Sequence, residues 1–171
     1  MIPFSWELEQ TEPEDLFELE AFYNLESNGL MLSALDLKPK QTNLKEISQQ
    51  FKKLGLKRNR YLYSLKKDGS LKAIIMINTS DVGINLSDLT NSTTVYILDS
   101  ENMPYNILKE SISILMKSLS MTDSPILIYP KEYLEFQEIP YERIYNLWVL
   151  NMNNTDNYFR YLTRLLRFVQ S

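Results

Sequence analysis

Two acidic side chains follow an apolar run near the middle of the chain and are the first candidates for acid–base chemistry. Asp99 and Glu101 come directly after the segment TTVYIL. A carboxylate at the end of a strand can accept a proton from a substrate amine, directly or through one water molecule. Acids at the start of a helix can instead stabilise the helix dipole or cap its first turn. The sequence leaves both interpretations open, as catalytic bases or as structural acids.

The composition restricts the other chemistry of this chain. Its 171 residues include no histidine and no cysteine. A His-based triad, an imidazole base and a His metal site are therefore excluded within the chain, as are disulfides and cysteine nucleophiles. We expect no metal centre. The chain also has no run of 18 or more apolar residues and no secretory signal pattern at MIPFSWELEQ. We expect a cytoplasmic protein with a single domain over residues 1–171, although the chain can also be a piece of a longer one.

Charge is distributed unevenly along the sequence. Residues 1–36 contain nine acidic residues and no lysine or arginine, whereas residues 38–72 contain eleven basic residues against Glu46 and Asp68. A basic segment can approach an anionic ligand or a nucleic acid. Because the net charge is −4, we expect the basic segment to lie beside the acidic one and neutralise it. Nucleic-acid binding is not expected.

The candidate acids must be positioned by the stretch from Tyr61 to Asp99. YLYSL and LKAIIMIN are strand-like runs on either side of Asp68-Gly69, a dipeptide typical of a β-hairpin turn. The run from Ala73 to Ile77 is continuously apolar, which predicts a central strand buried on both faces. TTVYIL is the predicted third strand, and it leads into the segment with Asp99 and Glu101.

Helical patterns surround this hairpin. We expect only helices before Tyr61, one from Pro13 to about Asn28-Gly29 and one over 44–54 that ends at Gly55. After the third strand, a helix is predicted from about Pro104 to Leu119. PILIYP follows as a strand parallel to the one before that helix. A short helix over 132–136, a strand over 142–151 and a final helix over 156–169 complete the prediction. The fold class is α+β, with a mixed, mainly antiparallel sheet, helices on both faces and a C-terminal helix.

This order of elements resembles that of the GNAT superfamily of acyl-CoA-dependent N-acyltransferases. The resemblance covers most of residues 16–151 and is carried by element order. In the family, a Gly-rich loop after the third of these strands binds the CoA pyrophosphate at the start of the long helix. The corresponding stretch here is DSENMPYNILKES, without glycine and without a basic residue before Lys109. Asp99 and Glu101 would repel a pyrophosphate, and Pro104 lacks a donor amide. The sequence therefore predicts an acyltransferase-like fold without the standard pyrophosphate loop.

The resemblance also assigns roles to individual residues. A tyrosine in the short helix of the family can protonate the leaving thiolate, and YPKEYLEFQ places Tyr133 at that position. Tyr133 can equally be an aromatic side chain packed under the sheet. If the chain is an enzyme, the resemblance implies Asp99 or Glu101 as base and Tyr133 as acid. Asn102 and Tyr105, at the start of the long helix, would then contact the acyl-CoA.

Two further segments are candidates for binding. The loop over 79–93 is rich in Ser, Asp and Asn, fails the EF-hand pattern, and leaves open a weak cation or polar-ligand site at Asp81, Asn85 and Asp88. The final predicted helix places Arg160, Arg164 and Arg167 on one stripe beside apolar residues. That stripe is either a solvated face or a docking surface for another protein or a second copy of the domain.

These patterns favour an acyltransferase-like domain that acts as a ligand- or protein-binding module and needs no cofactor. The alternative is a divergent acyl-CoA-dependent N-acyltransferase that acts on an amine. No membrane partner is expected.

Overall fold

The structure is a computed structural model that describes residues 2–27, 32, 35, 37, 49, 51–80, 91–121 and 124–144. Its described strands form one five-stranded sheet in the order β1-β2-β3-β4-β5. The elements are β1 (Trp6–Gln10), α1 (Pro13–Ser27), β2 (Arg58–Lys67), β3 (Ser70–Ser80), β4 (Thr93–Ile97), α4 (Tyr105–Ser118), β5 (Ile126–Tyr129) and α5 (Lys131–Phe136). Neighbouring strands pair antiparallel from β1 to β4, and β5 pairs parallel to β4. The predicted α+β class with a mixed, mainly antiparallel sheet is confirmed.

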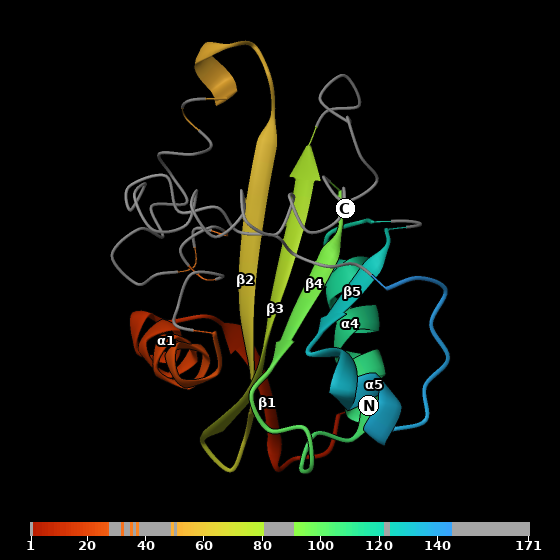
Figure 1. The fold of residues 1–171 in the computed structure, drawn as a ribbon. Coiled ribbons are helices and arrows are strands. Elements are labelled where there is room, and N and C mark those ends of the chain that lie inside the picture. The colour runs from red at the N-terminus through yellow and green to blue at the C-terminus, as the bar shows by residue number, and fades with distance from the viewer. Residues whose placement is uncertain are drawn as a thin grey trace, which may run out of the picture.

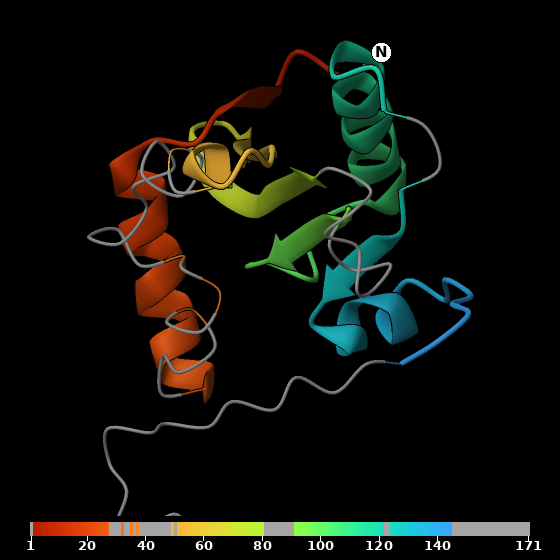
Figure 2. The same cartoon turned by 90° about the horizontal axis from the view of Figure 1, so that it is seen from above.

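Helices cover the sheet on both sides. α1 lies against one face and α4 against the other (Figure 1), and the view from above separates them clearly (Figure 2). We call these sides the α1 face and the α4 face. Side chains of a strand alternate between faces, so β3 supplies both cores: Ile74 and Met76 pack on the α1 face, whereas Ala73, Ile75 and Ile77 pack on the α4 face. The predicted central, doubly buried strand is confirmed.

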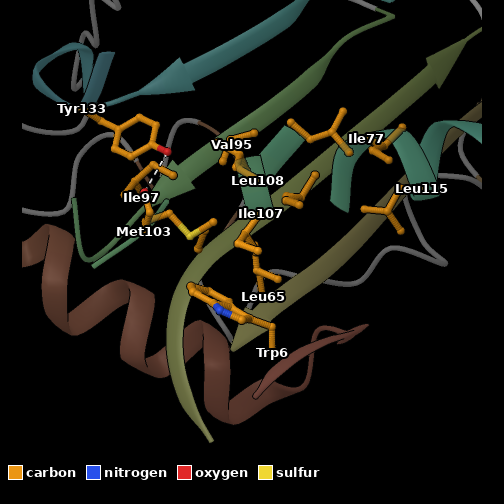
Figure 3. Packing of buried hydrophobic residues seen from close by; sticks show 13 residues of the cluster. Trp6, Leu65, Ile77, Val95, Ile97, Met103, Ile107, Leu108, Leu115 and Tyr133 are labelled. Atoms are coloured by element: carbon orange, nitrogen blue, oxygen red, sulfur yellow. Dashed lines mark hydrogen bonds between the residues drawn. The ribbon is translucent and has the colours of Figure 1, made fainter. Parts of the chain in front are cut away.

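The core of the α4 face is apolar. Figure 3 shows side chains from β1 to β4 gathered against those of α4, with Met103 and Tyr133 at one end of the cluster. Each fully buried aliphatic side chain of this kind contributes roughly 1.5–3 kcal/mol through the removal of apolar surface from water. The α4 face therefore contributes substantially to the stability of the described elements.

The β2–β3 hairpin has its turn at Asp68-Gly69, as the sequence predicts. Asp68 and Gly69 both have positive φ, at 49° and 77°. Two positive φ values in a two-residue loop match the turn whose twist suits antiparallel strands, and glycine adopts this conformation without a steric cost. Lys67 pairs with Ser70 across the turn, and the register shifts once, between Leu65 and Lys66.

The expectation of helices alone before Tyr61 is wrong at the N-terminus, where β1 pairs with β2 at the edge of the sheet. Trp6 is buried and Glu7 exposed, while Leu8 packs partly on the α4 face. This alternation has the period of a strand. The segment is short and two of its five residues are glutamates, so its apolar content alone did not indicate a strand.

The other predicted elements agree with the described residues. α1 begins at Pro13 and α4 follows Pro104. In the predicted helix over 44–54, residues 49 and 51–53 are helical, and Gly55 follows with a φ of 72°. Of the predicted strand over 142–151, only 142–144 are described, and these are irregular. The predicted C-terminal helix lies outside the described residues.

A buried ionic group fixes α1 to the sheet. Asp15 accepts hydrogen bonds from the Ser64 hydroxyl at 2.7 Å and from the backbone amide of Glu12 at 3.1 Å, and it pairs with Lys66 Nζ at 2.9 Å. Lys66 also pairs with Glu9 at 2.6 Å. Burial acts to raise the pKa of Asp15, but the hydrogen bonds from Lys66, Ser64 and Glu12 outweigh it and hold the pKa below its usual value. The acidic N-terminal segment is thus neutralised in part by a lysine of β2.

Among the described residues, no helix is long and apolar enough to cross a membrane.

Candidate functional site

The turn between β4 and α4 holds most of the residues that the sequence singled out, and Asp99 organises it. Asp99 Oδ1 accepts hydrogen bonds from the backbone N–H and the side-chain Nδ2 of Asn102, both at 3.1 Å. Asp99 Oδ2 lies 2.8 Å from Nζ of Lys72, on β3. The carboxylate therefore closes the turn and joins it to the neighbouring strand.

The same contacts keep Asp99 ionised. Burial acts to raise its pKa, but the hydrogen bonds from Lys72 and from Asn102 outweigh this effect and lower the pKa below its usual value. A carboxylate with a lowered pKa holds a proton weakly, so it is a poor general base near neutral pH. The geometry gives Asp99 a structural role, and its catalytic role stays a prediction.

Tyr133 connects α5 to the same turn. Its side chain is fully buried among the residues of the α4 face, and its hydroxyl donates a hydrogen bond to the carbonyl oxygen of Met103 at 3.0 Å (Figure 3). Burial raises the pKa of this hydroxyl, with a smaller contribution from Tyr105. The aromatic packing that the sequence left open is therefore present, and the hydroxyl lies beside the turn.

The remaining predicted residues of the turn differ in exposure. Glu101 and Asn102 are exposed, and Tyr105 is half-buried against the core of the α4 face. Pro104 stands at the N-cap of α4, which has no hydrogen bond from a capping side chain. The structure thus brings the five predicted residues of this region, Asp99, Glu101, Asn102, Tyr105 and Tyr133, to one end of α4.

A second polar region on the α1 face was not predicted. Tyr96 on β4 is 1% exposed, and its hydroxyl has no hydrogen-bond partner in the described structure. Its ring lies 6.5 Å from that of Tyr23, which in turn lies 5.7 Å from the ring of Tyr129. The signal in the sequence was slight, because one tyrosine in an apolar strand resembles any aromatic core residue.

Two polar side chains of β2 and β3 lie on the same face. Arg60 and Asn78 are paired across the strands, and Arg60 Nε donates to Asn78 Oδ1 at 3.0 Å. Arg60 also donates through Nη1 to the carbonyl oxygen of Leu35 at 3.0 Å. Burial raises the pKa of Tyr96, and the positive charge of Arg60 acts in the opposite direction.

Other predicted site residues lie outside the described residues. These are the cation candidates Asp81, Asn85 and Asp88 and the partner-binding candidates Arg160, Arg164 and Arg167. Within the part of the chain that the structure describes, no group of three or more acidic side chains could hold a metal ion.

No protein-family model and no curated protein sequence matches the chain. Solved structures align with most of the chain at low sequence identity. A ribosomal-protein-alanine N-acetyltransferase from Brucella melitensis aligns with a TM-score of 0.46 at 9% identity, over 85% of this chain and 99% of that one. A possible acetyltransferase from Clostridium difficile aligns with a TM-score of 0.36 at 17% identity, over 86% and 97%. Glucosamine-6-phosphate N-acetyltransferase from Arabidopsis thaliana aligns with a TM-score of 0.37 at 8% identity, over 86% and 98%.

These three TM-scores lie below 0.5, so the fold statement rests on the order and pairing of the elements. Three antiparallel strands, a long helix and a parallel strand follow one another as the resemblance implies. The observed order of these elements therefore agrees with the order that the sequence resemblance implies.

Proposed function

We propose that this chain is an acyltransferase-like domain that acts as a ligand- or protein-binding module and does not hold a CoA pyrophosphate at the β4–α4 turn. The observation that carries the proposal is the position of Asp99. Its carboxylate already accepts the backbone amide of Asn102 at 3.1 Å. Backbone amides of such a turn are the groups that bind a phosphate at a helix start. In this chain an internal carboxylate already accepts one amide of the turn, that of Asn102.

The charge of the turn also disfavours pyrophosphate binding, but the structure changes which acid is responsible. From the sequence, both Asp99 and Glu101 would repel a pyrophosphate. The structure pairs Asp99 with Lys72 at 2.8 Å, so the charge of Asp99 is largely compensated. The pairing also directs the ammonium group of Lys72 toward Asp99. The occupied amide of Asn102 and the exposed charge of Glu101 are therefore the obstacles to pyrophosphate binding that the turn presents.

One observation favours the alternative, a divergent acyl-CoA-dependent N-acyltransferase. The hydroxyl of Tyr133 lies 3.0 Å from the carbonyl oxygen of Met103, at the turn where the family's tyrosine would meet the cofactor. In that function Tyr133 would protonate the thiolate, and Glu101 or Asp99 would receive a proton from the amine through water. The lowered pKa of Asp99 makes this carboxylate a poor base.

Thermal unfolding with acyl-CoA separates the two functions. A ligand that binds only the native state raises the melting temperature. The binding-module proposal predicts an unchanged melting temperature with saturating acetyl-CoA or with a longer acyl-CoA. A rise of several degrees would overturn it in favour of the enzyme.

Two variants identify the obstacle to the cofactor. Glu101→Gln removes an exposed charge, whereas Asp99→Ala frees the amide of Asn102. If charge repulsion alone excluded the pyrophosphate, Glu101→Gln would gain acyl-CoA binding. The proposal predicts that Glu101→Gln does not gain it.

The partner surface stays a proposal based on sequence spacing. Arg160, Arg164 and Arg167 would form one stripe of a helix, and a basic stripe suits an acidic protein surface. Reversing all three to Glu should weaken self-association measured by analytical ultracentrifugation, or abolish capture of a binding protein. Unchanged association and unchanged capture would show that the stripe is not the interface.

A further inference from the structure

β1 is an edge strand, and among the described strands it pairs with β2 alone. Two backbone hydrogen bonds show which of its residues face β2. The amide of Asp68 donates to the carbonyl oxygen of Ser5 at 3.0 Å. The amide of Thr11 donates to the carbonyl oxygen of Leu62 at 3.0 Å. Because opposed residues of antiparallel strands alternate between hydrogen-bonded and non-hydrogen-bonded pairs, the odd-numbered residues from Ser5 to Thr11 turn their backbone groups toward β2.

The backbone groups of Leu8 and Gln10 therefore point away from β2, along the outer edge of β1. Within the described structure these groups have no hydrogen-bond partner. The edge is accessible, since Leu8 is half-buried and Gln10 is exposed. A row of unpaired N–H and C=O groups at the edge of a sheet is a template on which another strand can pair.

The two sides of this edge differ in chemistry. Leu8 packs partly against the core of the α4 face, and the exposed acids Glu7 and Glu9 lie on the opposite side of the strand. Glu9 is paired with Lys66 at 2.6 Å. Glu7 makes no ion pair in the part of the chain that the structure describes. A strand added here would meet an apolar residue at the centre of β1 and a carboxylate on either side of it.

Charge decides between a second copy of this chain and a different strand. A second β1 that paired antiparallel about Leu8 would place Glu7 of each chain opposite Glu9 of the other. Like charges directly opposite each other destabilise a strand pair, whereas opposite charges stabilise it. The edge is therefore protected against self-pairing, and it favours a strand with basic residues at these two positions.

We propose that the outer edge of β1 binds an extended basic segment of another protein as an added antiparallel strand. A central apolar residue of that segment lies opposite Leu8, exchanges both backbone hydrogen bonds with it and extends the core of the α4 face. Lysine or arginine on either side of that residue lies opposite Glu7 and Glu9. The inference rests on the proposed binding function and names its class of partner.

Selective N-methylation of a synthetic peptide tests this geometry. The probe is a capped peptide of alternating lysine and valine, titrated into the full chain by isothermal titration calorimetry. In the proposed pairing the valine amides donate to β1, whereas the lysine amides point away from it. N-methylation of the valines should abolish binding, and N-methylation of the lysines should leave it unchanged. Equal effects of the two modifications, or no binding of the unmodified peptide, would overturn the proposal.

Amide hydrogen exchange locates the bound peptide. In the free protein the amides of Leu8 and Gln10 should exchange faster than those of Glu7 and Glu9, because only the latter are bonded to β2. With the lysine–valine peptide, exchange at Leu8 and Gln10 should slow by about tenfold or more. Binding without protection at these two amides would mean that the peptide lies elsewhere, and the proposal would fail.

Two substitutions in β1 separate the backbone contribution from the charge. Gln10→Pro removes an outward amide without removing a bond to β2, a change that edge strands tolerate, and Gln10→Ala is the matched control that keeps the amide. Gln10→Pro should weaken the peptide by about fivefold, and Gln10→Ala should not. Glu7→Gln should weaken it by about threefold. Dimerisation of wild type that Gln10→Pro abolishes would overturn the proposal in favour of a second copy.

These outcomes are distinguishable from a failure of the proposed function. Binding of acyl-CoA would contradict that function at the β4–α4 turn, whereas the β1 edge is judged by the peptides and by the amides of β1 alone.

Discussion

The β4–α4 turn follows the end of β4, and Tyr96 lies within β4 on the α1 face. The polar groups of the two regions differ in their hydrogen bonding. At the turn, Asp99 binds Asn102 and Lys72, and Tyr133 binds the carbonyl of Met103. On the α1 face, the hydroxyl of Tyr96 has no partner in the described structure. The polar groups named at the turn are hydrogen-bonded within the protein, whereas the Tyr96 hydroxyl is not.

This difference suggests where a ligand can bind. A ligand gains most from polar groups that are buried and unpaired in the free protein, because it restores bonds that folding removed. It gains little from groups that must first release an internal partner. The turn that would hold a cofactor in an acyltransferase is thus a poor site for as long as Asp99 keeps its bonds to Asn102 and Lys72.

Acidification should have the largest effect, because it neutralises two satisfied carboxylates at once. The pKa values of Asp99 and Asp15 are both lowered in the folded protein. Their contribution to stability is therefore fully present above the unfolded pKa of about 3.9, and it is lost as the pH falls through the lower folded values. Urea midpoints should fall steeply below about pH 4.

The variant Asp15→Asn should flatten this pH dependence, because it removes one of the two titrating groups. A midpoint in wild type that is constant from pH 6 to pH 3 would show that neither carboxylate is stabilised by its contacts.

Asp99→Ala should give the largest effect of a single substitution at the turn. It leaves the amide of Asn102 and the half-buried ammonium of Lys72 without their partner. We expect a loss of about 1–3 kcal/mol in the free energy of unfolding, measured by urea denaturation. Glu101→Ala is the matched control at an exposed acid two residues away and should change stability by less than about 0.5 kcal/mol. Equal effects of the two variants would contradict the structural role of Asp99.

Tyr133→Phe should cost less, because it removes one neutral hydrogen bond from the buried core. The hydroxyl donates to the Met103 carbonyl, and its loss should lower the free energy of unfolding by about 1 kcal/mol. The ring keeps its packing, so no cavity is added. A neutral outcome would indicate that α5 does not hold the turn through this bond.

Thr93→Val should have the smallest effect. The hydroxyl of Thr93 is buried and unpaired in the described structure, and the residue pairs in register with Ile77 of the α4 face. Valine has the same shape without the polar group, so stability should be unchanged or raised by up to about 1 kcal/mol. A loss comparable with that of Tyr133→Phe would show that the Thr93 hydroxyl is satisfied.

The sequence predicted those parts of the fold that depend on local patterns. Asp68-Gly69 located the hairpin, the continuous apolar run of β3 placed that strand at the centre, and Pro13 marked the start of α1. β1 was missed because its acidic, five-residue segment gains its stability from pairing with β2, a strand about 50 residues later. Local pattern carries little information about such a distant partner.

The site was predicted less well for the same reason. The sequence identified Asp99 and Tyr133 as residues of interest. It did not identify Lys72, which comes 27 residues before Asp99, or the contact of Tyr133 with Met103, 30 residues away. These long-range contacts decide that Asp99 is held as an anion and that Tyr133 is buried. The sequence did not single out Tyr96, because the lack of a hydrogen-bond partner for its hydroxyl can be recognised only in the structure.

Equilibrium dialysis of acetyl-CoA against the wild-type chain tests the central claim most directly, because it measures binding without relying on activity or stability. The occupied turn predicts no saturable binding up to about 1 mM acetyl-CoA, which corresponds to a binding free energy weaker than about −4 kcal/mol. Saturable binding in the micromolar range would contradict the account and show that the β4–α4 turn opens to hold the cofactor.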